Sequence, residues 1–584
     1  MKEENSGIES NTPAERDRRV LELYEQVLEI EQRLIPTGLH VFGRVPEEAA
    51  RVDMLKMVAS FDRPEANARA LTDLVAEGAG FGGYTELLRA SKESAARLIE
   101  RERVDEIVLA AIELFIKQGA EAAALWLETT GGVEREASRP IFSLLSKICE
   151  QLATNSELES LMRALRGEYI EPGPGADIVQ NPDILPTGRN THAINPYLVP
   201  SRVAYARAEQ VVKSLLERHQ AEHGSYPRAM ALVLWGLDNI KTQGEGVAQA
   251  LWLLGVRPVR DAMNRATGVE VIPLEKLGRP RIDIVMTVSG IFRDLFGATI
   301  ILLDKAVRAV AVLDEPAEMN YVRRNIDEQM KQDGCLFDEA ALRIFSNAPG
   351  NYGANVNFMV MDSQWEKEDT LGDLFVTRKC FAYGRDAEGQ AVEGREARHA
   401  MERALSRVEA TYQNIDTFEI GITDVDHYFE YLGGVTKAVE NRRQVRPAVY
   451  LSDALSRDSK IRSLEETVRL ETRAKTLNPK WYEGMLKHGF RGVAEIESHI
   501  SNTFGWSATA DAVDDWVYTE VAKTFVLDGE MLDRMRTLNP HSARSLVGRL
   551  LEAHGRGFWM AEEHVLEQVR EIFNQLEDQL EGVC

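Results

Sequence analysis

The chain has 584 residues, of which 69 are basic and 93 acidic, and its formal net charge is −24. A chain of this length exceeds one hydrophobic core, and the usual size of domains predicts about three or four of them. The negative charge repels phosphate backbones and anionic surfaces, so we expect no nucleic-acid partner.

Two further patterns bear on location. No run of about 18 apolar residues and no apolar signal-peptide core occurs, which predicts a cytoplasmic protein without a transmembrane segment. The cysteines are scattered and form no Cys-x-x-Cys pair, so neither a disulfide framework nor a structural zinc site is expected. They are Cys149, Cys335, Cys380 and Cys584.

The N-terminal region is expected to be helical. Residues 1–14 are polar and charged, which favours disorder. Over residues 15–166, apolar side chains recur at intervals of three and four, a spacing typical of amphipathic helices packed on one another. Residues 167–200 are rich in Gly and Pro, which predicts a long loop without regular secondary structure, and such loops are often functional.

Residues 201–390 show the pattern of an α/β domain. A helix over 201–223 precedes a β-type run over 229–235, and a helix beginning near Gly246 precedes a second β-type run over 282–288. Strands that alternate with helices predict a parallel sheet buried on both faces. Ligands usually bind in loops at the carboxyl ends of such strands. These loops read WGLDNIKTQGEG and SGIFRD.

Residues 391–584 are expected to be mainly helical, so the whole chain is predicted to be a mixed α/β protein. This region contains a weak internal repeat, because Thr-Leu-Asn-Pro occurs at both 476–479 and 537–540. The repeat is either a duplicated helical hairpin or two uses of Asn-Pro as a helix start.

Two sequence matches to known motifs give little support to a dinucleotide-binding enzyme or a zinc protease. The segment 78–83 matches GxGxxG but follows a helix-like stretch, where a dinucleotide site needs a strand. The segment 219–223 matches the zinc-protease pattern HxxEH, but a solvated helix end without a third ligand is the favoured interpretation. No GxxxxGK[ST] occurs, so we expect this chain to bind no nucleotide and ATP chemistry to come from a partner.

Several collinear stretches resemble one known family. They include GEYIEPGPGADIVQNPDILPTGRNTHAINP, VLWGLDNIKTQGEGVAQALWLLGVRPV, IFSNAPGNYGANVNF, ITDVDHYFE and GWSATADAVDDWVY. The likeness runs from about residue 165 onward and reaches back faintly to about residue 20. The sequence is therefore identified as a member of the family of the large, porphyrin-binding subunit of magnesium chelatase, which also contains the large subunit of cobaltochelatase.

The phrases IFSNAPGNYGANVNF, FVTRKCFAYG and ITDVDHYFE look closer to the magnesium enzyme. The resemblance implies an ATP-dependent ligase that forms nitrogen–metal bonds, with Mg²⁺ and protoporphyrin IX as substrates, in chlorophyll or bacteriochlorophyll biosynthesis. It implies an AAA+ ATPase partner and a second partner with AAA+ and integrin-like domains. The setting would be the cytoplasm or the plastid stroma, with peripheral contact to a membrane.

The sequence also departs from the family. Family members are longer, and their first half carries a His-Gly-Thr-His segment that residues 1–584 lack. One alternative is a C-terminal half that needs a separate polypeptide to supply the first half and is inactive without its partners. Another is a non-catalytic tetrapyrrole carrier or regulatory subunit. A cobaltochelatase homologue acting on a corrin ring and a structural scaffold are further alternatives.

One segment has the chemistry that metal insertion requires. Mg²⁺ prefers oxygen ligands and gives up water reluctantly, and the porphyrin must lose two pyrrole protons. If residues 423–430 are helical, Asp424, His427 and Glu430 lie three apart on one face, so they are the predicted metal ligands and catalytic residues. The alternative is a capped helix start at Thr423 or Asp424, in which His427 merely packs.

A porphyrin is a flat apolar ring with two propionates, so its pocket is expected to combine aromatic walls with cationic side chains. Each aromatic residue is by itself more often part of a core, and Arg293 next to Asp294 is equally a structural ion pair. The candidates are Arg293, Asn351, Tyr352, Arg378, Lys379, Lys480, Trp481, Trp506 and His192, with Lys241 and Glu245 as a further pair.

Overall fold

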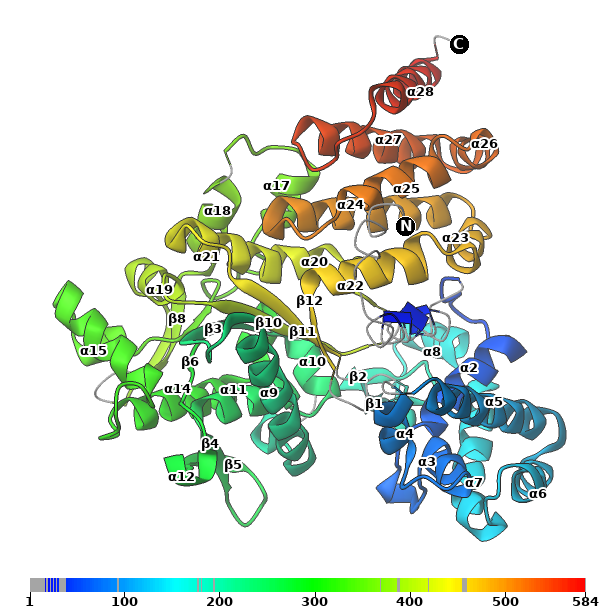
Figure 1. Ribbon diagram of the computed structural model, residues 1–584, viewed down its shortest axis with the longest axis horizontal. Coiled ribbons are helices and arrows are strands. Elements are labelled where there is room, and N and C mark those ends of the chain that lie inside the picture. The colour runs from blue at the N-terminus through cyan, green and yellow to red at the C-terminus, as the bar shows by residue number, and fades with distance from the viewer. Residues whose placement is uncertain are drawn as a thin grey trace. The chain divides into compact units, whose positions relative to one another are not determined.

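The computed structural model describes residues 38–582, apart from 92–93, 176–177, 180, 193–194, 368, 386–388, 418–419 and 454–459, and scattered positions from 16 to 30. The disorder predicted for residues 1–14 therefore lies outside the described residues, as does Cys584. The chain divides into two compact units, residues 1–34 with 40–193 and residues 35–39 with 194–584 (Figure 1).

Residues 48–165 of the first unit are mainly helical, as the sequence predicts. Its apolar stripes meet in a core that contains Leu55, Val75, Ile112, Leu127 and Leu145, all completely buried. The helices are α2 (Glu48–Ala59), α3 (Leu71–Gly78), α4 (Tyr84–Ser91), α5 (Ala95–Gln118), α6 (Ala120–Thr130), α7 (Arg135–Leu152) and α8 (Glu157–Leu165). The GxGxxG match is the turn between α3 and α4, so no strand precedes it and a dinucleotide fingerprint is ruled out there.

The Gly/Pro-rich segment contains more regular structure than predicted. Strand β1 (Pro172–Pro174) pairs in parallel with β2 (Asn190–His192). Two single-turn 3₁₀ helices, Pro182–Ile184 and Pro196–Leu198, each begin with Asn-Pro. The Asn side chain accepts a hydrogen bond from the backbone two residues later in both cases, so local capping organises a segment whose composition suggests a loop.

A sheet forms the centre of the second unit, as expected from the alternating strands and helices. Among the described residues, eight strands pair in the order β12-β11-β10-β3-β6-β7-β8-β9. The pairs from β11 to β7 are parallel, whereas β12, β8 and β9 are antiparallel. The strands are β3 (Ala229–Leu234), β6 (Asp283–Val288), β7 (Ile344–Ser346), β8 (Phe381–Arg385), β9 (Ala391–Glu396), β10 (Ala410–Ile415), β11 (Ala448–Asp453) and β12 (Ile461–Ser463).

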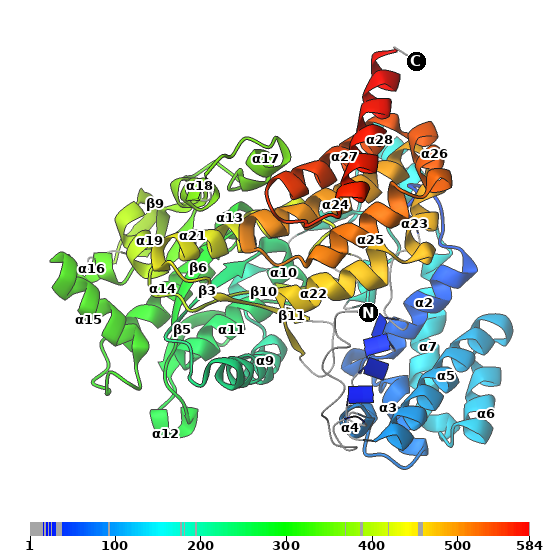
Figure 2. The same ribbon diagram turned by 45° about the horizontal axis from the view of Figure 1, so that its top comes forward.

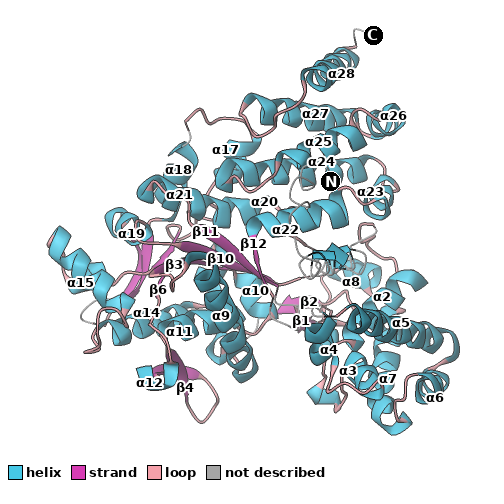
Figure 3. Cartoon of the chain, viewed as in Figure 1, coloured by secondary structure: helices cyan, strands magenta, loops and turns pink. Residues whose placement is uncertain are grey.

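The sheet is buried on both faces, because successive side chains of a strand point to opposite sides. In β3, Ala231 and Val233 enter one core and Leu232 and Leu234 the other. Figure 1, Figure 2 and Figure 3 show helices on either side of the strands.

One core is lined by α9 (Arg202–His223), α11 (Glu245–Leu254), α13 (Gly290–Leu295), α14 (Gly297–Ala311), α15 (Tyr321–Asp333) and α16 (Phe337–Ala340). The other is lined by α17 (Val356–Met361), α18 (Asp369–Lys379), α19 (Arg398–Leu405), α21 (Gly434–Arg443), α22 (Leu464–Glu471), α23 (Pro479–Leu486), α24 (Phe490–Ala510), α25 (Asp515–Phe525), α26 (Gly529–Leu538), α27 (Pro540–Gly555) and α28 (Glu563–Glu581).

The remaining short elements are α10 (Gly236–Lys241), α12 (Leu274–Leu277), α20 (Asp426–Tyr428) and the antiparallel ribbon of β4 (Val256–Arg260) and β5 (Ala266–Val271). The sheet also extends past the boundary predicted at residue 390, since β9 to β12 pair into it. Among the described residues, no helix is long and apolar enough to cross a membrane.

Two sequence patterns in this unit are resolved by the structure. Asn478 and Asn539 cap α23 and α27, and the following prolines take the first helical position. The use of Asn-Pro as a helix start therefore explains the repeated Thr-Leu-Asn-Pro. The solvated helix end predicted at 219–223 is wrong for His219, which is buried against Tyr450 of β11 because the end of α9 packs on the sheet.

A buried ion pair between neighbouring strands generates the first prediction. Arg343 binds Asp283 through two contacts of 2.9 and 3.1 Å, and both side chains are almost fully buried. Asp283→Asn removes the negative charge opposite a buried guanidinium, so we expect the free energy of unfolding of this unit to fall by about 3 kcal/mol. Urea unfolding followed by tryptophan fluorescence measures the change.

The matched control is the exposed pair of Arg257 and Glu270 on the β4–β5 ribbon. Glu270→Gln is expected to leave the urea midpoint unchanged, because solvent screens exposed ion pairs. Equal midpoints for Asp283→Asn and the unchanged protein would show that the buried pair does not stabilise the sheet.

Candidate functional site

The carboxyl ends of the parallel strands form one edge of the sheet. From β3 the strand order runs to β6 and β7 on one side and to β10 and β11 on the other, so the direction in which strands are added to the sheet reverses between β3 and β10, while the two strands stay parallel. Open α/β sheets usually bind ligands at such a reversal. At this edge β3 leads into α10 and β6 into α13, while the segments 347–355 and 416–425 follow β7 and β10 and lead to most of the predicted site residues.

His427 and Glu430 form a close pair at this edge. His427 Nδ1 lies 2.8 Å from Glu430 Oε2. The imidazole is 61% exposed and the carboxylate only 1%, so the ring faces solvent above a buried acid. Glu430 belongs to a π-helical turn, Phe429–Gly433, that joins α20 to α21. Such turns are frequent at functional sites.

The loop after β7 closes on Glu430. The backbone N–H groups of Ala354 and Asn355 both donate to Oε1, the second at 2.6 Å. Gly353 has a φ of +68°, and a Cβ atom there would lie 3.0 Å from Oε1, so glycine suits both the backbone and the contact. The hydrogen bond that the Glu430 carboxylate accepts raises the pKa of His427 above the ordinary 6.5, because it favours the imidazolium form.

Arg293, Asn351, Tyr352 and Arg378 gather beside this pair. Arg293 donates to Asp294 at 2.7 Å and to the carbonyl of Asn351 at 2.8 Å, and its guanidinium lies 5.1 Å from the centre of the Tyr352 ring. Because Arg293 is buried, the structural interpretation of this ion pair is the better one. Arg378 is partly exposed, with Nη2 3.5 Å from the Tyr352 carbonyl.

Lys379 lies at the same place, but its side chain is completely buried. Its Nζ donates to Asn347 at 2.6 Å and lies 3.7 Å from the centre of the Tyr431 ring. Burial holds the pKa of Lys379 well below its usual range. The expectation that Lys379 binds a propionate therefore needs correction, because in this structure the amine is enclosed by protein.

Exposed apolar side chains border these residues. Ile291 and Leu295 lie one turn apart on α13, which packs against α10 and its exposed Leu237. The ring of Tyr352, also exposed, lies against Gly290 at the start of α13. We call Leu237, Ile291, Leu295 and Tyr352 the apolar patch.

Asp424 is not part of the His427 pair. It precedes α20, and its carboxylate contacts Lys475, His499 and the backbone N–H of Gly421. Burial alone would raise the pKa of Asp424, but the hydrogen bond with His499 and the charge of Lys475 lower it well below its usual range.

Asp424 is thus separated from the other two predicted metal ligands, because the helix begins only at Asp426. Across the ranges that the structure describes, no three His, Cys, Asp or Glu side chains are grouped closely enough to hold a metal ion. The capped helix start is not observed either, since no side chain caps α20.

Four further candidates remain, Trp481, Trp506, Lys480 and His192. Trp481 and Trp506 are buried in the core, so neither ring presents a face to a ligand, and the core interpretation is the better one. Lys480 is exposed at the start of α23. His192 ends β2, and its side chain lies outside the described residues.

Sequence reasoning named Lys241 and Glu245 but missed two further acids at the strand reversal, Asp238 and Asp416. Lys241 pairs with Asp416 at 2.9 Å, and buried Glu245 lies 3.7 Å from Arg207. Asp238 is buried between them, and burial together with the nearby acids raises the pKa of Asp238 well above its ordinary value. Its position directly after a β-type run was the available signal.

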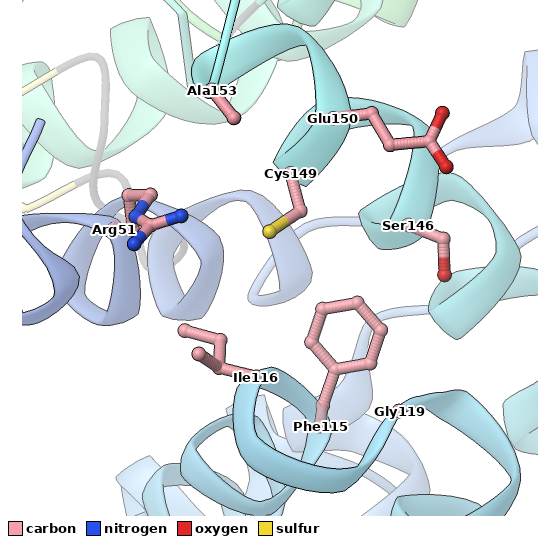
Figure 4. Close-up of a pocket in the computed structure, with 8 residues that line it drawn as sticks. All are labelled: Arg51, Phe115, Ile116, Gly119, Ser146, Cys149, Glu150 and Ala153. Atoms are coloured by element: carbon pink, nitrogen blue, oxygen red, sulfur yellow. The ribbon is translucent and has the colours of Figure 1, made fainter. Parts of the chain in front are cut away.

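A separate pocket lies in the first unit (Figure 4). It has a volume of about 340 Å³ and contains none of the predicted site residues. It is lined by Arg51, Phe115, Ile116, Gly119, Ser146, Cys149, Glu150 and Ala153.

A family model described as CobN/Magnesium Chelatase matches residues 2–566. The chain belongs to this family. It is 44% identical to the chloroplastic magnesium-chelatase subunit ChlH of Oryza sativa subsp. indica, over 98% of this chain and 43% of that protein. It is 37% identical to a magnesium-chelatase subunit of Chlorobaculum parvum, over 97% of this chain and 45% of that protein.

The family also includes cobalt enzymes. The chain is 32% identical to the aerobic cobaltochelatase subunit CobN of Sinorhizobium sp., over 95% of this chain and 46% of that one. The solved catalytic subunit of cobaltochelatase from Mycobacterium tuberculosis superposes with a TM-score of 0.89 at 31% identity, over 98% of this chain and 48% of that one. The chain therefore spans less than half the length of these relatives.

The His427–Glu430 contact generates the second prediction. In histidine NMR titrations, the pKa of His427 is expected to lie above 6.5 and to fall toward it in Glu430→Gln. The raised pKa also means that this contact stabilises the fold below about pH 6.5 and that the contribution is lost as pH rises through the raised value. A His427 pKa unchanged by Glu430→Gln would contradict the contact.

Proposed function

We propose that this chain forms part of a magnesium chelatase, with Mg²⁺ and protoporphyrin IX as its substrates and with ATP hydrolysed by partner subunits. The observation that carries the proposal is the exposed imidazole of His427 above the buried carboxylate of Glu430, next to the apolar patch and Arg378. Relatives named magnesium-chelatase subunits, at 37–44% identity, support the choice of reaction.

His427 is the proposed proton acceptor. Glu430 occupies Nδ1, which leaves Nε2 to take a proton from a pyrrole nitrogen as the metal enters. The buried carboxylate then stabilises the imidazolium, which returns the proton to solvent before the second pyrrole proton leaves. The base works only when it is neutral, so insertion is expected to speed up as pH rises through the pKa of His427.

The apolar patch is the proposed binding surface for the porphyrin macrocycle. A porphyrin edge or face gains contact with Ile291, Leu295 and Tyr352, while Arg378 is placed to bind a propionate. Arg293 then acts indirectly, since it holds the Tyr352 loop through the carbonyl of Asn351.

Other chains complete the enzyme in this proposal. The chain spans less than half the length of its relatives, so a further polypeptide segment supplies the remainder of the large subunit. The relatives are named as subunits, and the proposed partners are an AAA+ ATPase and a protein with AAA+ and integrin-like domains. The lack of a P-loop sequence in this chain agrees with that division of labour.

The third prediction tests ligand binding and insertion separately. Quenching of porphyrin fluorescence measures binding, first by this chain alone and then with a polypeptide that supplies the rest of the large subunit. Arg378→Ala is expected to weaken binding by about tenfold through loss of a charge-assisted hydrogen bond. His427→Ala is expected to keep binding but slow Mg²⁺ insertion by the complete complex by about 100-fold.

His541→Ala is the matched control, because His541 is exposed on α27. Binding without insertion in the complete complex would instead indicate a carrier, and preference for a corrin with Co²⁺ would indicate the cobalt enzyme. Normal porphyrin binding and Mg²⁺ insertion by both Arg378→Ala and His427→Ala would contradict the proposed site and favour a structural scaffold.

A further inference from the structure

The loop Gly421–Asp424 leads directly into the helix that carries His427. Two consecutive peptide N–H groups of this loop are held by one carboxylate from outside it. Glu471, the last residue of α22, accepts from the N–H of Ile422 at 2.9 Å and from the N–H of Thr423 at 3.1 Å. It also accepts from the Thr423 hydroxyl at 2.6 Å. Only 2% of Glu471 is exposed.

The carbonyl groups of the same two residues are also held by side chains. Trp506 donates to the carbonyl of Ile422 at 2.9 Å, and Asn502 donates to the carbonyl of Thr423 at 3.0 Å. Both donors lie on α24, which packs along the π-helical turn that contains Glu430. The backbone of the loop is therefore fixed by α22 and α24 instead of by a strand or helix of its own.

The fit at Gly421 is close. A Cβ atom at this position would lie 2.2 to 2.6 Å from the Glu471 carboxylate, so any other residue would displace it. At the far end of the loop, His499 of α24 contacts the Thr423 hydroxyl at 3.0 Å and Asp424 at 3.3 Å. Asp424 thus anchors the loop, which gives a role to the residue misplaced by helical spacing.

We propose that Glu471 is a positioning residue, whose carboxylate fixes the Gly421–Asp424 loop and thereby places His427 on Glu430. This inference deepens the function proposed above and rests on it for its effect on catalysis. Glu471→Gln puts an amide NH₂ among three hydrogen-bond donors, so at least one of them loses its acceptor in a buried place. The loop must then shift, and α20 begins two residues after it.

The fourth prediction uses the titration of His427 as a readout that needs no substrate. The groups that act on this imidazole are Glu430, Asp426 and Lys379. Glu471→Gln is expected to lower the pKa of His427 toward 6.5, because a shifted α20 loses the contact with Glu430. Gly421→Ala, which leaves every charge in place, is expected to act in the same direction.

Asp283→Asn is the matched control, since it makes the same chemical change at a buried carboxylate at the opposite edge of the sheet. It is expected to destabilise the fold without changing the pKa of His427. If Glu471→Gln and Gly421→Ala leave that pKa unchanged, Glu471 serves stability alone and the proposal is overturned. If Glu471→Gln does not fold, Thr423→Val removes one of its contacts and supplies the same comparison.

Insertion kinetics with the complete complex separate this inference from the proposed function. We expect Glu471→Gln to lower kcat on the order of 100-fold with little change in KM, as for a misplaced catalytic group. One possible result is that Glu471→Gln lowers the pKa of His427 while the protein without substitutions binds no porphyrin. That result would support the positioning role and reject the proposed function. An unchanged kcat in an active complex would overturn the catalytic consequence of the positioning role.

Discussion

The carboxylate of Glu430 joins the sheet edge to the helical layer that covers it. It comes from the helix that follows β10, while its backbone donors, Ala354 and Asn355, come from the loop that follows β7. Burying a charge is costly unless hydrogen bonds replace water, and here two N–H groups and an imidazole do so. Gly353, with its left-handed backbone, and the π-helical turn both lie at this carboxylate.

The pattern of apolar residues predicted the central strands of the sheet better than its short outer strands. The β-type runs at 229–235 and 282–288 are confirmed as β3 and β6, because strands buried on both faces need continuous apolar residues. Strands β7 and β12 are too short to leave such a pattern. In the site, the spacing of His427 and Glu430 indicated a pair that the structure contains, whereas Asp424 failed because the helix starts after it. Glu471 could not be found, since its partners lie 48 and 49 residues away.

Charge is distributed unevenly over this acidic chain. Around the carboxyl edge, Arg293, Arg378 and Lys241 are cationic, while burial raises the pKa of Asp238 and so favours its uncharged form. Asp294 and Asp416 offset two of these cations, and Arg378 is the partly exposed one beside the apolar patch. A partly exposed guanidinium on a chain of net charge −24 can attract an anionic ligand to one place.

The strand order also constrains how the molecule forms. Several helix pairs of the first unit, such as α4 with α5 and α5 with α6, are neighbours in sequence, and such local contacts form quickly. The second unit must bring β10 beside β3 across about 180 residues before the loops at the carboxyl edge can meet. His427 reaches Glu430 locally, but Glu430 reaches the Ala354 loop only after β7 and β10 have joined the same sheet. The complete site therefore needs both β7 and β10 in the sheet, and a nascent chain that stops before β10 leaves the edge of β3 unpaired and lacks the segment that carries His427 and Glu430.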